Sequence, residues 1–78
     1  MKLLEQKVQV VARFDGAGVR PLAFNWRGRR WPVQKVVRTW QQFALLEEQV
    51  QVFLVETGSR LAQLSYFPQS GWWQLDKM

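Results

Sequence analysis

The residues of this chain best suited to chemistry are arginines set among aromatic side chains. Residues 24–40 read FNWRGRRWPVQKVVRTW and contain three of the five tryptophans in the 78-residue sequence. Arginine binds phosphate through two parallel hydrogen bonds, and an exposed tryptophan offers a stacking surface to the bases of a single strand. The pattern predicts a nucleic-acid-binding hairpin, with candidate residues Arg27, Arg29, Arg30, an exposed Trp31 and Arg38.

The distribution of charge agrees with an anionic partner such as DNA or RNA. Residues 16–46 carry six basic side chains and no acidic one, whereas the rest of the chain carries five basic and six acidic side chains. The whole net charge of +5 therefore lies in the centre of the sequence. Clustered positive charge attracts phosphate and releases its counterions on binding. An ordinary solvated basic face explains the same charge equally well.

A second candidate surface lies at the C-terminal end, where Trp72 and Trp73 are adjacent. Neighbouring side chains of a strand point to opposite faces, so one of the two is exposed or meets a partner unless both faces of the sheet are covered. That partner is a nucleic acid, another protein, or a second copy of the chain paired through an open sheet edge.

The sequence offers little for catalysis. It contains no histidine and no cysteine. These absences exclude disulfides, thiolate zinc sites and the common nucleophile–histidine pairs. Asp15 and Asp76 are expected to be turn-forming or solvent-exposed carboxylates and not general bases. Glu47 and Glu48 are sequence neighbours whose side chains point to different faces, so they are not expected to act as a catalytic pair. We expect no catalytic residue, no metal, no cofactor and no enzymatic activity.

Periodicity and turn residues predict an all-β fold for residues 1–78 as one small domain. Alternation over residues 8–14 and 22–26, and an apolar run at 50–55 paired with 61–67, indicate strands, and glycine-bearing turns separate them. Residues 29–39 favour a strand, although 34–46 also fit a helical period, and a short helical turn is possible near 41–49. About six antiparallel strands in a curled sheet, forming a small barrel or sandwich, are expected.

Burial and location follow from the same composition. A domain of this size needs its tryptophans in the core, so we expect Trp26 and Trp40 inside, with Trp31 or one of Trp72 and Trp73 partly exposed. The opening MKLLEQKVQ lacks the apolar core of a signal peptide, and no later run could span a bilayer. A cytoplasmic location is expected, with no membrane partner.

Two motifs resemble a small bacterial family of domains of unknown function, number 6504. The first motif, F-x-W-x-G-R-x-W-x-V-x-x-V-x-x-x-W, is carried by Phe24, Trp26, Gly28, Arg29, Trp31, Val33, Val36 and Trp40. The closing motif, G-W-W-x-L, is carried by Gly71, Trp72, Trp73 and Leu75. The resemblance implies no catalytic residue. It leaves two hypotheses for a small binding module, which are nucleic-acid binding through the basic hairpin and protein interaction or self-association through the aromatic C-terminal strand.

Overall fold

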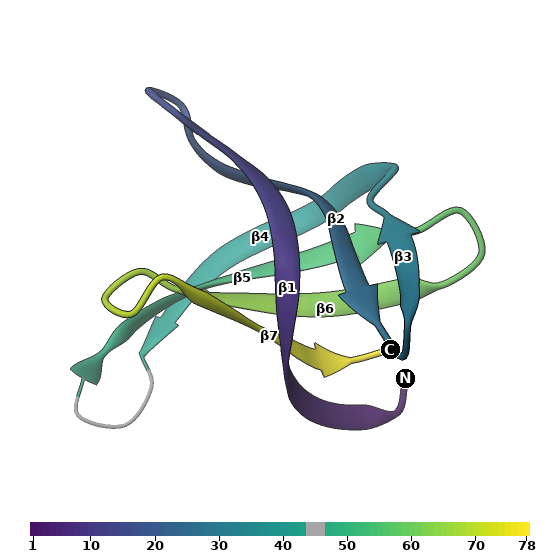
Figure 1. The fold of residues 1–78 in the computed structure, drawn as a ribbon. Coiled ribbons are helices and arrows are strands. Elements are labelled where there is room, and N and C mark those ends of the chain that lie inside the picture. Colours follow the sequence, from purple (N-terminus) through teal and green to yellow (C-terminus); the bar gives the residue numbers. More distant parts are fainter. Residues whose placement is uncertain (44–46) are drawn as a thin grey trace.

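The computed structural model describes residues 1–43 and 47–78, which form seven strands of one antiparallel sheet (Figure 1). The sheet has the strand order β3-β2-β1-β7-β6-β5-β4 and curls into a half-barrel. The strands are β1 (Leu3–Asp15), β2 (Gly18–Trp26), β3 (Arg29–Pro32), β4 (Lys35–Phe43), β5 (Gln49–Glu56), β6 (Leu61–Phe67) and β7 (Trp72–Lys77).

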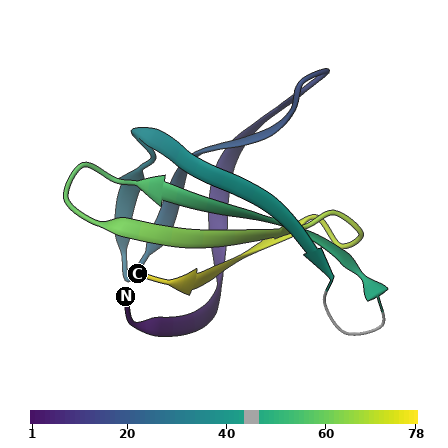
Figure 2. The ribbon, with the colours of Figure 1, turned by 180° about the vertical axis from the view of Figure 1, so that it is seen from behind.

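The sheet curls at β1, which pairs with β7 along its first part and with β2 along its second part. β1 pairs with β7 through its first residues, up to Val8, and with β2 from Gln9 onward. The two end strands, β3 and β4, are consecutive in the chain, with only Val33 and Gln34 between them. The Val33 amide donates to a carbonyl of β2, and the Gln34 amide donates to a carbonyl of β5. The chain thus passes from one end of the sheet to the other at this corner (Figures 1 and 2).

The concave face of the sheet holds the hydrophobic core. Phe24 and Trp31 from the β2–β3 side pack in one cluster with Phe53, Leu64 and Leu75 from β5, β6 and β7. All five side chains are buried. Partly buried residues of β1, including Val8 and Val10, close the cluster. Burial of these large apolar side chains is the main stabilising contribution in a chain without disulfides.

The convex face carries a buried polar network around Asp76, which is 8% exposed. The register between β6 and β7 shifts at this point, and a bulge of this kind re-aims a side chain. The Asp76 carboxylate accepts hydrogen bonds from Ser65 Oγ, from Gln63 Nε2 at 3.0 Å and from Gln74 Nε2 at 2.9 Å. Three donors satisfy a carboxylate that would otherwise be costly to bury.

The expected all-β class and antiparallel curled sheet are confirmed, and residues 1–43 and 47–78 form seven strands where about six were expected. The additional strand arises at Val33 and Gln34, where the single strand predicted for 29–39 is divided into β3 and β4. β5 is buried on both faces, and it pairs with β6 as predicted.

The sequence left a short helical turn open near residues 41–49. In the structure β4 continues to Phe43 and β5 begins at Gln49, so both ends of this segment are strand. Residues 44–46 lie outside the described part. Simple alternation over residues 22–26 would put Leu22 on the same face as Phe24, but Leu22 is exposed and Phe24 is buried. The register between β1 and β2 shifts between Val11 and Ala12, opposite Leu22, so the strand changes phase there.

Candidate nucleic-acid interface

Two residues, Arg27 and Gly28, make the turn of the β2–β3 hairpin. Trp26 pairs with Arg29 across it, and both turn residues have positive φ, 52° for Arg27 and 69° for Gly28. Two consecutive positive φ angles define the type I′ turn, whose twist matches that of a hairpin. The second position suits glycine, as predicted from the sequence. The first normally holds asparagine, aspartate or glycine, and an arginine there costs about 1–2 kcal/mol.

The arginines beside this turn lie over indole rings. The Arg27 guanidinium carbon lies 4.5 Å from the centroid of the Trp26 ring, and that of Arg29 lies 4.1 Å from the Trp31 ring. The two indoles are themselves in contact, with centroids 6.2 Å apart and planes tilted by 49°. We call Trp26, Arg27, Arg29 and Trp31 the hairpin cluster. Each of its cations is attracted to a ring face by the ring quadrupole.

The indoles of the hairpin cluster are anchored to the body of the protein. The Trp31 ring is 7% exposed and packs nearly parallel to Phe24, with centroids 6.4 Å apart and an interplanar angle of 9°. Trp26 is half-buried, and its Nε1 donates a hydrogen bond of 3.0 Å to Gln6 Oε1 on β1. Among the described residues, the buried Trp31 Nε1 has no hydrogen-bond partner. The arginines therefore rest on rings whose positions are set by the core and by β1.

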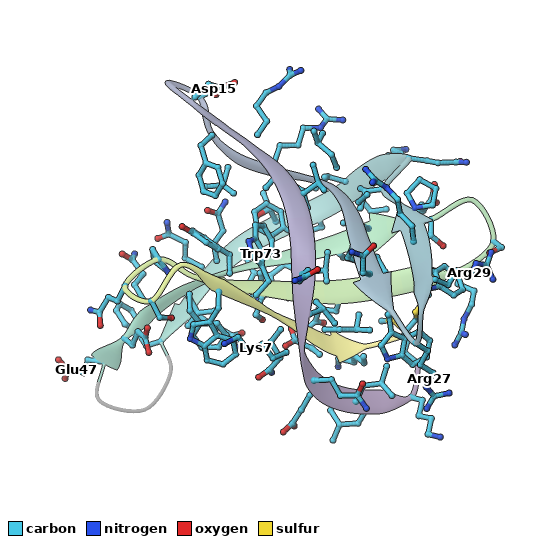
Figure 3. The ribbon with its side chains drawn as sticks, viewed as in Figure 1. Lys7, Asp15, Arg27, Arg29, Glu47 and Trp73 are labelled. Carbon is cyan, nitrogen blue, oxygen red and sulfur yellow. The ribbon has the colours of Figure 1, made fainter. Side chains whose placement is uncertain are left out.

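This arrangement suits the binding of phosphate. A guanidinium that stacks through its face keeps its in-plane N–H donors available for a second, bidentate partner. The cross-strand neighbours of Arg29 and Arg30 are Trp26 and Asn25, which carry no charge. Arg27 and Arg29 are exposed, and Figure 3 shows both at the same end of the molecule.

The two chain ends lie beside this turn in both ribbon views (Figures 1 and 2). The backbones of Lys2 and Met78 exchange two hydrogen bonds, of 2.8 and 3.0 Å, and Lys77 pairs with Leu3. Lys2 and Lys77 thus add positive charge to the end of the half-barrel that carries the hairpin cluster. Clustering of this kind raises the local attraction for anions.

The structure places four of the five predicted nucleic-acid-binding residues on the β2–β3 hairpin, namely Arg27, Arg29, Arg30 and Trp31. Trp31 was expected to be exposed and to stack on bases, and this is wrong, because the ring faces the core under Arg29. Arg38 is also separate from the hairpin. It lies on β4, pairs with Leu54 and stacks at 5.4 Å over Trp40.

The tryptophans at the C-terminal end have opposite environments. Trp73 is 5% exposed and contacts Tyr66 and Phe53, at centroid distances of 4.8 and 5.6 Å. Trp72 is only partly buried on the other face and stacks on Phe67, with centroids 4.6 Å apart and planes 8° from parallel. The expectation that one of the pair is partly exposed is confirmed for Trp72.

Sequence reasoning was less successful for other aromatic and basic residues. Trp26 packs against the core but is only half-buried, and Trp40, expected inside, is half-buried on β4 opposite Val52. Lys7 was not singled out, yet its Nζ lies 5.3 Å from the Trp72 ring. That contact depends on the pairing of β1 with β7, between opposite ends of the chain, so no local pattern announces it.

Two further observations concern the part of the chain that the structure describes. No group of three His, Cys, Asp or Glu side chains among these residues could hold a metal ion. No helical segment within residues 1–43 and 47–78 has the length and apolar character needed to span a membrane.

Fold and site together define a small all-β domain, an antiparallel half-barrel with a basic, tryptophan-supported hairpin. The chain belongs to the family described as Domain of unknown function (DUF6504), whose model matches residues 1–75. The resemblance seen in the two tryptophan motifs is thereby confirmed. No curated protein and no solved structure matches the chain.

Proposed function

We propose that this protein is a nucleic-acid-binding module that holds backbone phosphates at the β2–β3 hairpin. The observation that carries the proposal is the stacking of two arginines on tryptophans of the same hairpin, at 4.5 and 4.1 Å. Stacking restricts the arginine rotamers before any ligand arrives, so less side-chain entropy is lost on binding.

In this proposal Arg27, Arg29 and Arg30 contact phosphate oxygens of single-stranded DNA or RNA. Trp31 supports Arg29 from below and does not touch a base, because it is buried. Phosphate contacts position a strand without reading its sequence, so binding shows little sequence preference. The module acts in the cytoplasm as a binding protein, without a cofactor and without catalysis.

A titration of a fluorescein-labelled twelve-nucleotide oligothymidine, followed by anisotropy at low salt, tests the proposal. The unmodified protein binds, and the Arg27→Gln/Arg29→Gln variant binds at least about fivefold more weakly, as loss of two phosphate contacts requires. A matched variant, Lys35→Gln/Arg60→Gln, removes the same charge outside the β2–β3 hairpin and changes affinity much less. Absence of binding at low salt, or equal losses in the two variants, contradicts the proposal.

A second candidate function is protein interaction or self-association through the aromatic strand β7. The observation in its favour is the partly exposed Trp72, stacked on Phe67 and accompanied by Lys7. Trp73 takes no part, since it is buried. Sedimentation of the protein over a range of concentrations tests self-association. A dimer that dissociates in Trp72→Ser supports this candidate, and a monomer at all concentrations counts against it.

A further inference from the structure

The half-barrel is open between the projecting β1–β2 hairpin and β4. The hairpin extends beyond the body of the sheet in both ribbon views (Figures 1 and 2), and Asp15 lies at its tip (Figure 3). A cavity of about 320 Å³ lies between this hairpin and β4. We call it the slot. On one side it is lined by Val36, Thr39 and Phe53, and on the other by six residues of the hairpin, namely Arg13, Asp15, Ala17, Gly18, Val19 and Arg20.

Backbone edges flank the slot. β4 (Lys35–Phe43) is an end strand of the sheet order, and eight of its nine residues pair with β5, with a register shift between Val36 and Arg38. Every second residue of an edge strand turns its N–H and C=O away from the neighbouring strand, where they can pair with an added strand. Across the slot, β2 pairs with β3 only from Ala23 to Trp26, so its residues 18–21 have β1 as their strand partner.

One side of the slot is largely apolar, and the other side carries two arginines. Phe53 is buried, and Val19 and Val36 are partly buried against the core. Arg13 and Arg20 line the slot and lie directly opposite each other across the β1–β2 pair. Like charges in directly opposite positions destabilise a sheet. Asp15 lies nearby, with one carboxylate oxygen engaged at 2.8 Å by the amide of Ala17. Asp15 thus supplies one negative charge to this side of the slot, where Arg13 and Arg20 supply two positive charges.

We propose that the slot binds an extended acidic segment of a partner protein, which adds a strand to β4. Successive side chains of an extended segment point in opposite directions, so its apolar residues would face Phe53 and Val36 while its carboxylates reach Arg13 and Arg20. Backbone pairing with β4 supplies affinity, and the arginine pair selects acidic over basic segments. The slot uses neither the hairpin cluster nor Trp72, so this inference is independent of both candidate functions above.

The test uses a labelled seven-residue peptide of alternating glutamate and valine, followed by anisotropy. The peptide binds, a lysine–valine peptide does not, and Arg13→Gln/Arg20→Gln weakens binding about fivefold, as expected for two partly exposed ion pairs. The control variant Arg60→Gln/Lys77→Gln changes affinity less than twofold. The Arg13→Gln/Arg20→Gln variant should unfold at the same temperature as the unmodified protein or at a higher one, because a repulsive pair has been removed. An unchanged or raised unfolding temperature shows that weaker binding does not result from loss of folding.

Amide hydrogen exchange places the bound peptide. Binding slows exchange at alternate residues of β4, and an N-methylated peptide that cannot pair through its backbone gives no such protection. Three results overturn the inference. They are equal weakening in the slot and control variants, protection confined to strands other than β4, and displacement of the peptide by an oligonucleotide.

Discussion

The guanidinium group of Arg29 lies over the indole ring of Trp31, two residues along the same strand, at 4.1 Å from its centroid. Residues i and i+2 of a strand share a face, so this contact follows from the spacing R-x-W and needs no long-range pairing. Trp31 in turn packs parallel to Phe24 in the core. The exposed guanidinium of Arg29 thus rests on an indole ring whose position is fixed by the hydrophobic core.

Replacing Arg29 by lysine separates its charge from its geometry. Lysine keeps the positive charge but loses the planar group that stacks and forms two parallel hydrogen bonds. We expect Arg29→Lys to weaken oligonucleotide binding by about two- to fivefold, the equivalent of one cation–π contact. Anisotropy titrations at several salt concentrations measure this, and the dependence of affinity on salt should stay the same. A lysine variant that binds as tightly as the unmodified protein would show that stacking has no part in recognition.

Trp31 is predicted to contribute through stability. Trp31→Ala should lower the free energy of unfolding by about 3–5 kcal/mol, as expected for deletion of a large buried side chain. Trp31→Phe should cost much less, because it keeps a ring beneath Arg29 and removes a buried N–H that has no partner in the described part of the chain. Denaturation in guanidinium chloride provides both values. A larger loss in the phenylalanine variant than in the alanine variant would contradict the assigned packing.

The strands were largely predictable from the sequence because their signals are local. Alternation and glycine turns identify the β6 and β7 segments and the turn at Gly28, since each depends on a few adjacent residues. The division at Val33 and Gln34 was not predictable. It depends on hydrogen bonds to β2 on one side and to β5 on the other, and those partners are distant in sequence.

The candidate site was predictable in part for the same reason. The crowding of Arg27, Arg29 and Arg30 at a turn is visible in the sequence, and the structure places all three on one hairpin. Alternation puts Trp31 on the same face of the strand as Arg29, but it does not say which face is concave. The burial of Trp31 and the separation of Arg38 become clear only from the curl of the sheet and the strand order.

Arg27 should show a conflict between stability and binding. Its φ of 52° falls in the left-handed region that asparagine tolerates better, and asparagine followed by glycine is a favoured type I′ pair. We expect Arg27→Asn to leave the free energy of unfolding unchanged or to raise it by up to about 1 kcal/mol, since relief of strain outweighs the lost stacking on Trp26. The same variant should bind oligonucleotides more weakly. Chemical denaturation and anisotropy on one preparation measure both, and a loss of stability above about 1 kcal/mol would contradict the strain argument.

Asp76 is expected to stabilise the convex face. Asp76→Asn exchanges an acceptor of three hydrogen bonds for a side chain that brings its own donors toward Gln63, Ser65 and Gln74. The free energy of unfolding should fall by about 1–3 kcal/mol. Glu5→Gln serves as the control. Glu5 is an exposed carboxylate that lines a surface groove together with Asp76, and its replacement should have little effect. Similar losses in both variants would argue against a structural role for the network.

The dependence of oligonucleotide affinity on salt tests nucleic-acid binding at the hairpin most directly. Each phosphate contact with a single strand contributes about 0.7 to the slope of log affinity against log salt. If Arg27, Arg29 and Arg30 each hold one phosphate, the Arg27→Gln/Arg29→Gln/Arg30→Gln variant should show a slope smaller by about 2 than that of the unmodified protein. An unchanged slope in a folded triple variant, or no measurable binding by the unmodified protein at low salt, would contradict the proposed function.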